Sequence, residues 1–154
     1  VLKERIMDPI GASTTWRWYG YDNTWVNMDG VEMQSVSGGG HHGGGIFINT
    51  LDHARLGLLF ARKGQWQGQQ LIAKSWTDMI QTPTPANASY GYMWWLNQGE
   101  RAWEGVPGHL YYAAGFGGNF IVVDEQNDLV IVTRWLQPSE IGEMVRRVYG
   151  SWKG

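Results

Sequence analysis

Two glycine-rich segments of the 154-residue sequence are the places where its residue types could serve chemistry. The first, residues 37–45, sets the pair His41-His42 between two glycine triplets. Glycine lets a backbone turn sharply and approach a ligand closely, and histidine can contact a ligand or bind a metal. Adjacent histidines in an extended chain point to opposite sides, so we predict that His41 and His42 line a substrate pocket rather than share a metal ion. A plain surface loop is the alternative.

The second segment is Tyr111–Asn119, with the sequence YYAAGFGGN. A strand of small apolar residues that ends in open glycines could aim backbone N–H groups at the negative oxygen that develops on an attacked carbonyl. Tyr112, Ala113, Ala114 and Gly115 are therefore candidate substrate contacts. The alternative is a glycine-rich bend that only joins two strands of a sheet.

The sequence contains no motif for a serine or cysteine nucleophile, a metal site or a nucleotide site. None of the seven serines begins a Ser-x-x-Lys motif, no Gly-x-Ser-x-Gly elbow occurs, and the absence of cysteine removes thiolate zinc sites and cysteine nucleophiles. Metal-hydrolase and nucleotide-binding motifs are also missing. The formal net charge is -2 without any basic block. We therefore expect no metal, no cofactor, no nucleic-acid partner and no membrane partner.

The sequence holds ten tryptophans, well above average usage. Large aromatic rings most often fill a core or form the wall of a pocket, and this is our interpretation of them. A flat platform on which sugar rings stack is the alternative, and it would make the chain a stand-alone binding module.

The first half of the chain predicts helices around an irregular stretch. Residues 1–7 are interpreted as the tail of a helix. Residues 12–37 show no clear period and are expected to be irregular, with turns near Asp22-Asn23 and Asp29-Gly30. A helix is predicted from Asn49-Thr50 to the terminating Gly64. A second, short helix is expected to open with a capping box formed by Ser75 and Asp78.

The second half predicts strands and a closing helix. Strands are expected at residues 90–96, 119–124 and 129–135, the last two joined by the four-residue loop of a hairpin. A helix opening at Pro138 should follow, with an apolar face made of Ile141, Met144, Val145 and Val148.

Four segments, in this order, resemble the serine β-lactamase-like hydrolases. They are DPIG at 8–11, GGIFINTLDHARLG at 44–57, YGYMWW at 90–95 and AGFGGNFIVVD at 114–124. The family includes class C β-lactamases, DD-peptidases, related esterases and 6-aminohexanoate-dimer hydrolases. The resemblance implies an α+β class and a partial serine β-lactamase/DD-peptidase-like fold, with antiparallel sheet strands, a C-terminal helix and part of the helical subdomain.

The resemblance also implies a mechanism. In that family a serine of a Ser-x-x-Lys motif attacks an acyl carbonyl and forms an acyl-enzyme, and both the serine and a second motif that holds a tyrosine lie upstream of the DPIG-like segment. This chain should therefore be the C-terminal part of such an enzyme and inactive alone. By similarity, the backbone N–H of Phe116 would form half of the oxyanion hole, next to Gly115.

One departure from the family concerns its third motif, Lys-Thr-Gly or His-Ser/Thr-Gly, which falls on Ala113-Ala114-Gly115. The cationic residue is absent, so recognition of a substrate carboxylate loses its partner. Loops around Trp16, Trp18, His41 and His42 would border the substrate cleft. An uncharged amide or ester therefore suits this chain better than a penicillin.

These inferences predict residues 1–89 as part of the helical subdomain and cleft loops, and residues 90–154 as sheet strands and closing helix of the same domain. The expected partners are a small-molecule amide or ester and the missing N-terminal half of the domain, and an unpaired strand edge would also allow a homodimer. Periplasm and cytoplasm both stay open as compartments.

Overall fold

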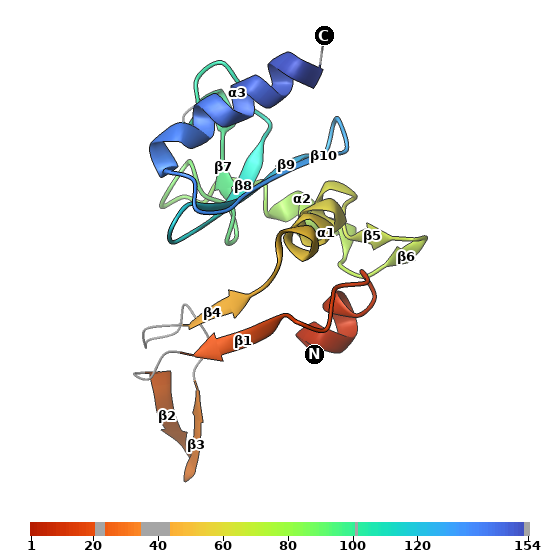
Figure 1. Ribbon diagram of the computed structural model, residues 1–154, viewed down its shortest axis with the longest axis vertical. Coiled ribbons are helices and arrows are strands. Elements are labelled where there is room, and N and C mark those ends of the chain that lie inside the picture. Colours follow the sequence, from red (N-terminus) through yellow and green to blue (C-terminus); the bar gives the residue numbers. More distant parts are fainter. Residues whose placement is uncertain (21–23, 35–43, 101, 153–154) are drawn as a thin grey trace. The chain divides into compact units, whose positions relative to one another are not determined.

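A computed structural model describes the chain except for residues 21–23, 35–43, 101 and 153–154 (Figure 1). The described residues form two units, each treated by itself below. The first joins Val1–Gly11 to Thr50–Gly154, and the second is Ala12–Asn49. The expected division at residue 89 concerns a larger domain and stays a prediction.

A four-stranded antiparallel sheet forms the centre of the first unit. Its strands are β7 (Trp95–Leu96), β8 (Tyr111–Gly115), β9 (Asn119–Asp124) and β10 (Leu129–Thr133), in the order β10-β9-β8-β7. The predicted hairpin is confirmed, since β9 and β10 pair in antiparallel register. The strand expected at residues 90–96 is wrong in extent: only its last two residues pair with β8, and Tyr90 makes a single bridge to Trp95.

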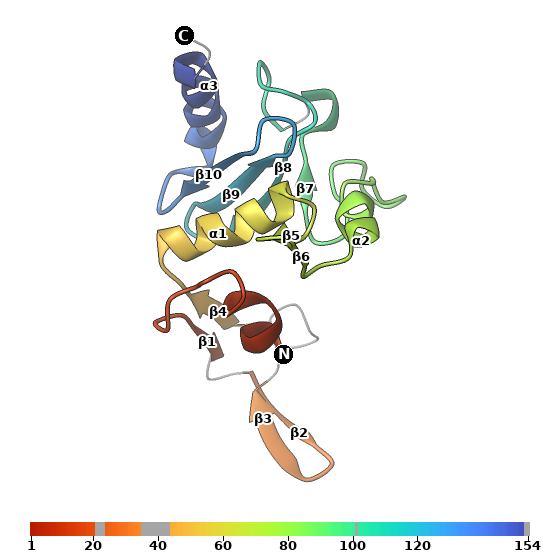
Figure 2. The ribbon, with the colours of Figure 1, turned by 90° about the vertical axis from the view of Figure 1, so that its right-hand side faces the viewer.

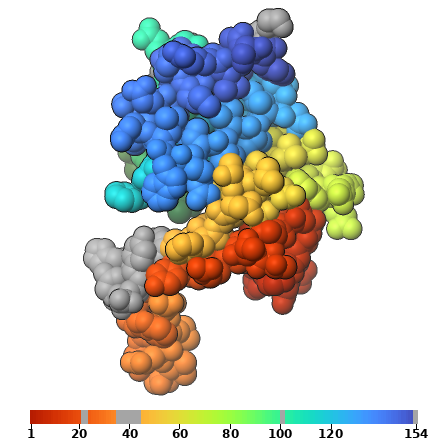
Figure 3. All heavy atoms as spheres, in the orientation of Figure 1, coloured from red at the N-terminus to blue at the C-terminus, as the bar shows by residue number. Residues whose placement is uncertain are grey.

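Helix α3 (Ile141–Trp152) covers one face of this sheet, after a 3-10 turn at Pro138–Glu140. Figure 2 shows α3 on the opposite side of the sheet from helix α1, and in Figure 3 the dark blue atoms of α3 lie directly on lighter blue atoms of the sheet hairpin. Ile141, Val145 and Tyr149 join the strand side chains in one buried cluster. Met144, expected on this apolar face, is instead 40% exposed.

Helix α1 (Thr50–Ala61) covers the other face, where the core includes Tyr111, Ile121 and Val123. Gly57 explains how closely it packs. A Cβ atom built on Gly57 would lie 2.6 Å from Val130 Cγ1 and 2.7 Å from Ile121 Cγ2. The helix therefore approaches β9 and β10 at a point where only glycine fits.

Smaller elements complete the first unit. A π-helical turn spans Lys3–Met7, a two-stranded ribbon pairs β5 (Gln65–Trp66) with β6 (Gln69–Gln70), and α2 covers Lys74–Met79. The short helix near Ser75 was predicted, but its capping box was wrong, because the helix is preceded by Ala73, which makes no side-chain cap. Asp78 instead pairs with Lys74 and Lys63.

The second unit is built from two antiparallel ribbons rather than the irregular chain expected there. Strand β1 (Arg17–Gly20) pairs with β4 (Gly44–Phe47), and β2 (Trp25–Met28) pairs with β3 (Val31–Gln34). The turn predicted at Asp29-Gly30 joins the second pair, with φ of 53° and 86° at these residues. Two positive φ values in a two-residue turn match the right-handed twist of a hairpin. The turn predicted near Asp22-Asn23 lies outside the described residues.

Within the described part of the chain, no helix is both long and apolar enough to cross a lipid bilayer.

Candidate functional site

The candidate site is the turn between β8 and β9, made of Phe116, Gly117 and Gly118. Gly117 and Gly118 have φ of 79° and 76°, a left-handed conformation that favours glycine. A side chain on Gly118 would collide with the backbone of Leu136, and a Cβ on Gly117 would lie 2.7 Å from the Trp135 ring. The segment is therefore a tight bend between two strands, and it leaves Phe116 fully exposed.

The half of β8 that leads into this turn has one open edge. Strand β7 pairs only with Tyr111 and Tyr112, whereas β9 pairs with the whole of β8. Ala113, Ala114 and Gly115 consequently have no strand neighbour on the β7 side among the described residues. An open strand edge presents backbone N–H and C=O groups that an extended ligand can use.

The conformation of the turn is held by Asn119. Its Nδ2 atom donates a hydrogen bond of 2.7 Å to the carbonyl oxygen of Phe116, and its Oδ1 atom accepts one of 2.7 Å from Nε of Arg134. The Gly118 carbonyl accepts from the Leu136 N–H and from the Thr133 hydroxyl, both at 3.3 Å. The turn is therefore anchored to the chain that follows β10.

Arg134 also acts on His53, near the start of α1. Burial lowers the pKa of His53 from its ordinary value, and the positive charge of Arg134 lowers that pKa further. The Nδ1 atom of His53 is buried and has no hydrogen-bond partner. Sequence reasoning included Asn119 in the candidate segment but missed its role, and it missed Arg134 and Trp135 at this site. Their contacts join the ends of different strands and leave no local pattern.

The structure brings together part of the predicted site. Ala113, Ala114, Gly115 and Phe116 follow one another along the open edge and turn. The ring of Tyr112 is packed in the core, with its centroid 4.3 Å from that of Trp103, and burial raises the pKa of its hydroxyl. His41 and His42 lie outside the described residues, and Trp16 and Trp18 belong to the second unit.

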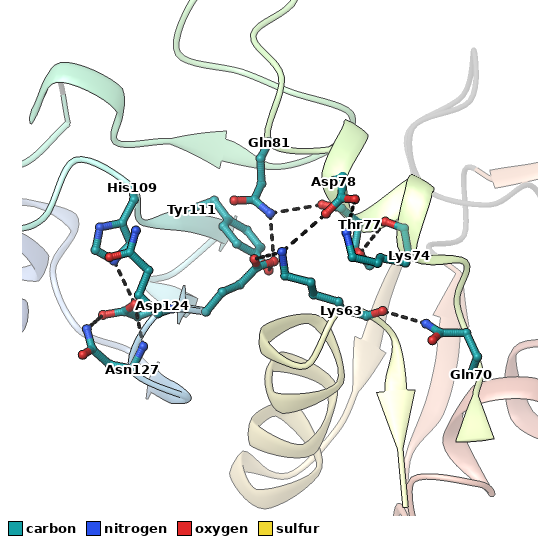
Figure 4. A network of polar contacts seen from close by, with 12 residues as sticks. Lys63, Gln70, Lys74, Thr77, Asp78, Gln81, His109, Tyr111, Asp124 and Asn127 are labelled. Carbon is teal, nitrogen blue, oxygen red and sulfur yellow. Dashed lines mark hydrogen bonds and ion pairs between the residues drawn. The ribbon is translucent and has the colours of Figure 1, made fainter. Parts of the chain in front are cut away.

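Two polar networks lie on other parts of the first unit (Figure 4). In one, the buried carboxylate of Asp124 accepts hydrogen bonds from Tyr149, from Asn127 Nδ2 at 2.6 Å and contacts His109 Nε2 at 2.8 Å. Burial acts to raise the pKa of Asp124, but these hydrogen bonds outweigh it and hold that pKa below its ordinary value. This network ties the β9–β10 loop to α3 and to the chain before β8.

In the other network, Lys63 lies between Asp78, at 3.5 Å, and Glu125, at 3.3 Å. Glu125 also accepts from the hydroxyl of Tyr111 at 3.0 Å. A hollow of about 420 Å³ nearby is lined by Arg62, Lys63 and Lys74 among others, and all three pair with carboxylates. Both networks serve to join elements, and no group of three metal-ligating side chains occurs in the described residues.

Comparison with known proteins adds a similarity of fold. No protein-family model matches the chain, and no curated protein matches it. A solved structure from Bacillus anthracis, named as a 6-aminohexanoate-dimer hydrolase, matches 69% of this chain with a TM-score of 0.52 and 19% sequence identity. The match spans 29% of that protein, so the chain corresponds to less than a third of its length. The chain is thus a mixed α+β structure that shares part of the fold of this hydrolase.

Proposed function

We propose that this chain is the C-terminal part of a serine hydrolase that cleaves an amide or an ester through an acyl-enzyme, with the nucleophile in sequence upstream of Val1. The observation that carries the proposal is the β8–β9 turn, where an open strand edge leads directly to the Phe116 peptide. The partial fold shared with a hydrolase supports the same function.

The geometry suits the binding of a substrate carbonyl. The backbone N–H of Phe116 would donate to the developing oxyanion, and the N–H of the upstream serine would supply the second donor. The open edge of Ala113–Gly115 would hold the substrate in an extended conformation. No charged side chain occurs in residues 111–118, so an uncharged amide or ester is the substrate class that this segment favours.

The proposed partner of the sheet is the missing half of the domain. On its side away from β9, strand β10 has no strand neighbour among the described residues. Exposed edges of this kind pair readily with other chains, and natural proteins usually cover them. We propose that an upstream strand of the same protein covers the β10 edge, with a second copy of the chain as the alternative.

The test compares two proteins: this chain alone, and the full reading frame that continues upstream of Val1. The longer protein should hydrolyse p-nitrophenyl acetate and bind a fluorophosphonate probe covalently, at a serine of an upstream Ser-x-x-Lys motif identified by peptide mass spectrometry. This chain alone should do neither. A longer protein without such a serine, or one that hydrolyses the ester equally well after this serine is replaced by alanine, contradicts the proposal.

A second candidate function, a binding module for carbohydrate, rests on the tryptophans. All ten lie in described residues, and only Trp94 is buried in the core. Six are exposed, at positions 18, 25, 76, 95, 135 and 152, so core packing does not account for most of them. Retardation of the chain in polysaccharide-containing gels, relieved by free sugar, would favour this function over hydrolysis.

A further inference from the structure

Trp135 has an unusual backbone and an unusual exposure. Its φ is 60°, in the left-handed region that any residue with a Cβ atom adopts at a cost in free energy. A bulky residue in this conformation is rare, and such strain is concentrated where a protein binds or reacts with a ligand. The side chain is 74% exposed, so burial of the ring does not explain the conformation.

The contacts of the Trp135 ring place it against the β8–β9 turn. A Cβ atom on Gly117 would lie 2.7 Å from Cζ3 and 3.0 Å from Cε3 of Trp135. Hydrogen bonds on both sides keep this arrangement, since the next residue, Leu136, donates to the Gly118 carbonyl and the preceding residue, Arg134, donates to Asn119. The left-handed backbone thus sets the indole over the peptide that follows Phe116.

The turn against which this ring lies carries no charged side chain. Phe116, on the same turn, is fully exposed, and residues 111–118 carry no charged side chain. Arg134 is the nearest charge along the chain, and its Nε donates to the neutral amide of Asn119. Aromatic rings that border a carbonyl-binding position offer a large contact area to an apolar group and no partner to a carboxylate.

We propose that Trp135 is a specificity-determining residue whose ring, together with Phe116, binds an apolar chain or ring of an uncharged ester or amide substrate. This inference rests on the proposed hydrolase function. Substrates with longer apolar groups should gain from the contact, and substrates with a carboxylate in the same place should lose.

The experiment uses the full-length protein and three esters: p-nitrophenyl acetate, p-nitrophenyl octanoate and the p-nitrophenyl ester of succinic acid, which carries a carboxylate. Wild-type protein should prefer octanoate to acetate and both to succinate. In W135A the ratio of kcat/KM for octanoate over acetate should fall about 10-fold, while W135F retains most of the ratio. W152A is the matched control, because Trp152 is 49% exposed at the end of α3; it should leave the ratio unchanged.

Three outcomes overturn the assignment to Trp135. The octanoate-to-acetate ratio could stay the same in W135A, activity on both esters could fall equally, or only the thermal stability could fall, which would mean that another part of the protein covers the ring. Titration with N-octylacetamide, followed by NMR, distinguishes failure of the Trp135 assignment from failure of the hydrolase function. If wild type binds the amide saturably, W135A does not bind it and wild type hydrolyses no ester, the apolar site stands and the hydrolase function is rejected. If wild type shows no binding and no hydrolysis, both proposals are rejected.

Discussion

The proposed catalytic contribution of Phe116 depends on its backbone N–H and not on its ring. Two substitutions distinguish the effect of the N–H from that of the ring. F116P removes the N–H, since proline has no backbone donor, whereas F116A keeps it. In the full-length protein, F116P should lower kcat for p-nitrophenyl acetate by about 10²- to 10³-fold, the loss typical of one oxyanion-hole donor. F116A should stay within a few-fold of wild type on this short ester.

The comparison depends on both variants being folded, which circular dichroism and thermal unfolding check. Equal activity of folded F116P and F116A would show that the N–H of Phe116 does not contact the reacting carbonyl. Gly115 precedes the substitution and is extended in β8, a conformation that a following proline tolerates.

Asp124 gives a prediction about pH at the same scale. Because hydrogen bonds hold the pKa of its carboxyl below the ordinary value, the ionised form stabilises the fold above the unfolded-state pKa, about 3.9, and this contribution is lost as pH falls through the lower, folded-state pKa. D124N should lower the free energy of unfolding by about 2–4 kcal/mol near neutral pH, because buried donors lose a charged acceptor. The difference from wild type should shrink in acid.

Urea unfolding at a series of pH values measures this effect, with D128N as the control. Asp128 pairs with Arg62 at the surface, where such a pair contributes at most about 1 kcal/mol. Two results would show that the buried network is not the cause: equal decreases in the free energy of unfolding in D124N and D128N, or a decrease in D124N that stays the same at acidic pH.

At the scale of elements, the distance between α1 and the sheet depends on Gly57. G57A would bring a methyl group within 2.7 Å of Ile121 and Val130, and overpacking of this kind costs about 1–3 kcal/mol, more than the gain in helix propensity. G150A is the matched control in α3, where nothing lies within 4 Å of the added Cβ, and it should stabilise by up to about 1 kcal/mol. Thermal unfolding of both variants measures these effects. A G57A variant as stable as G150A would contradict the close packing of α1 on β9 and β10.

Elements with a local signal could be predicted from the sequence. Strand β9 has the predicted bounds, and the hairpin to β10 and helix α3 follow from β-branched runs and an apolar helical stripe. Elements that depend on their surroundings could not. Strand β7 is short because pairing with β8 stops at Tyr112, and no aromatic pattern encodes that limit.

The candidate site divides in the same way. The glycines of the turn could be found because positive φ favours that residue type. The contacts of Asn119 with Arg134 and of Trp135 with Gly117 arise only when the ends of β9 and β10 meet. They therefore could not be predicted from the sequence.

At the scale of the whole molecule, the two units differ in what holds them together. The first has two buried apolar clusters, one on each face of its sheet. In the described part of the second, Ile48 is the single buried apolar residue. The register of β2 and β3 puts Val26, Met28, Val31 and Met33 on one face of their hairpin, where the last three are exposed.

A two-stranded hairpin without a covered apolar face is marginally stable in water, and such segments open with a small free energy. Amide hydrogens of β2 and β3 should therefore exchange within about two orders of magnitude of the unprotected rate, while those of β9 exchange only with opening of the first unit. Hydrogen exchange followed by mass spectrometry of fragments measures both in one experiment, with β9 as the internal reference. Protection of β2 and β3 equal to that of β9 would contradict the prediction, and it would mean that the four-residue apolar face is covered in solution.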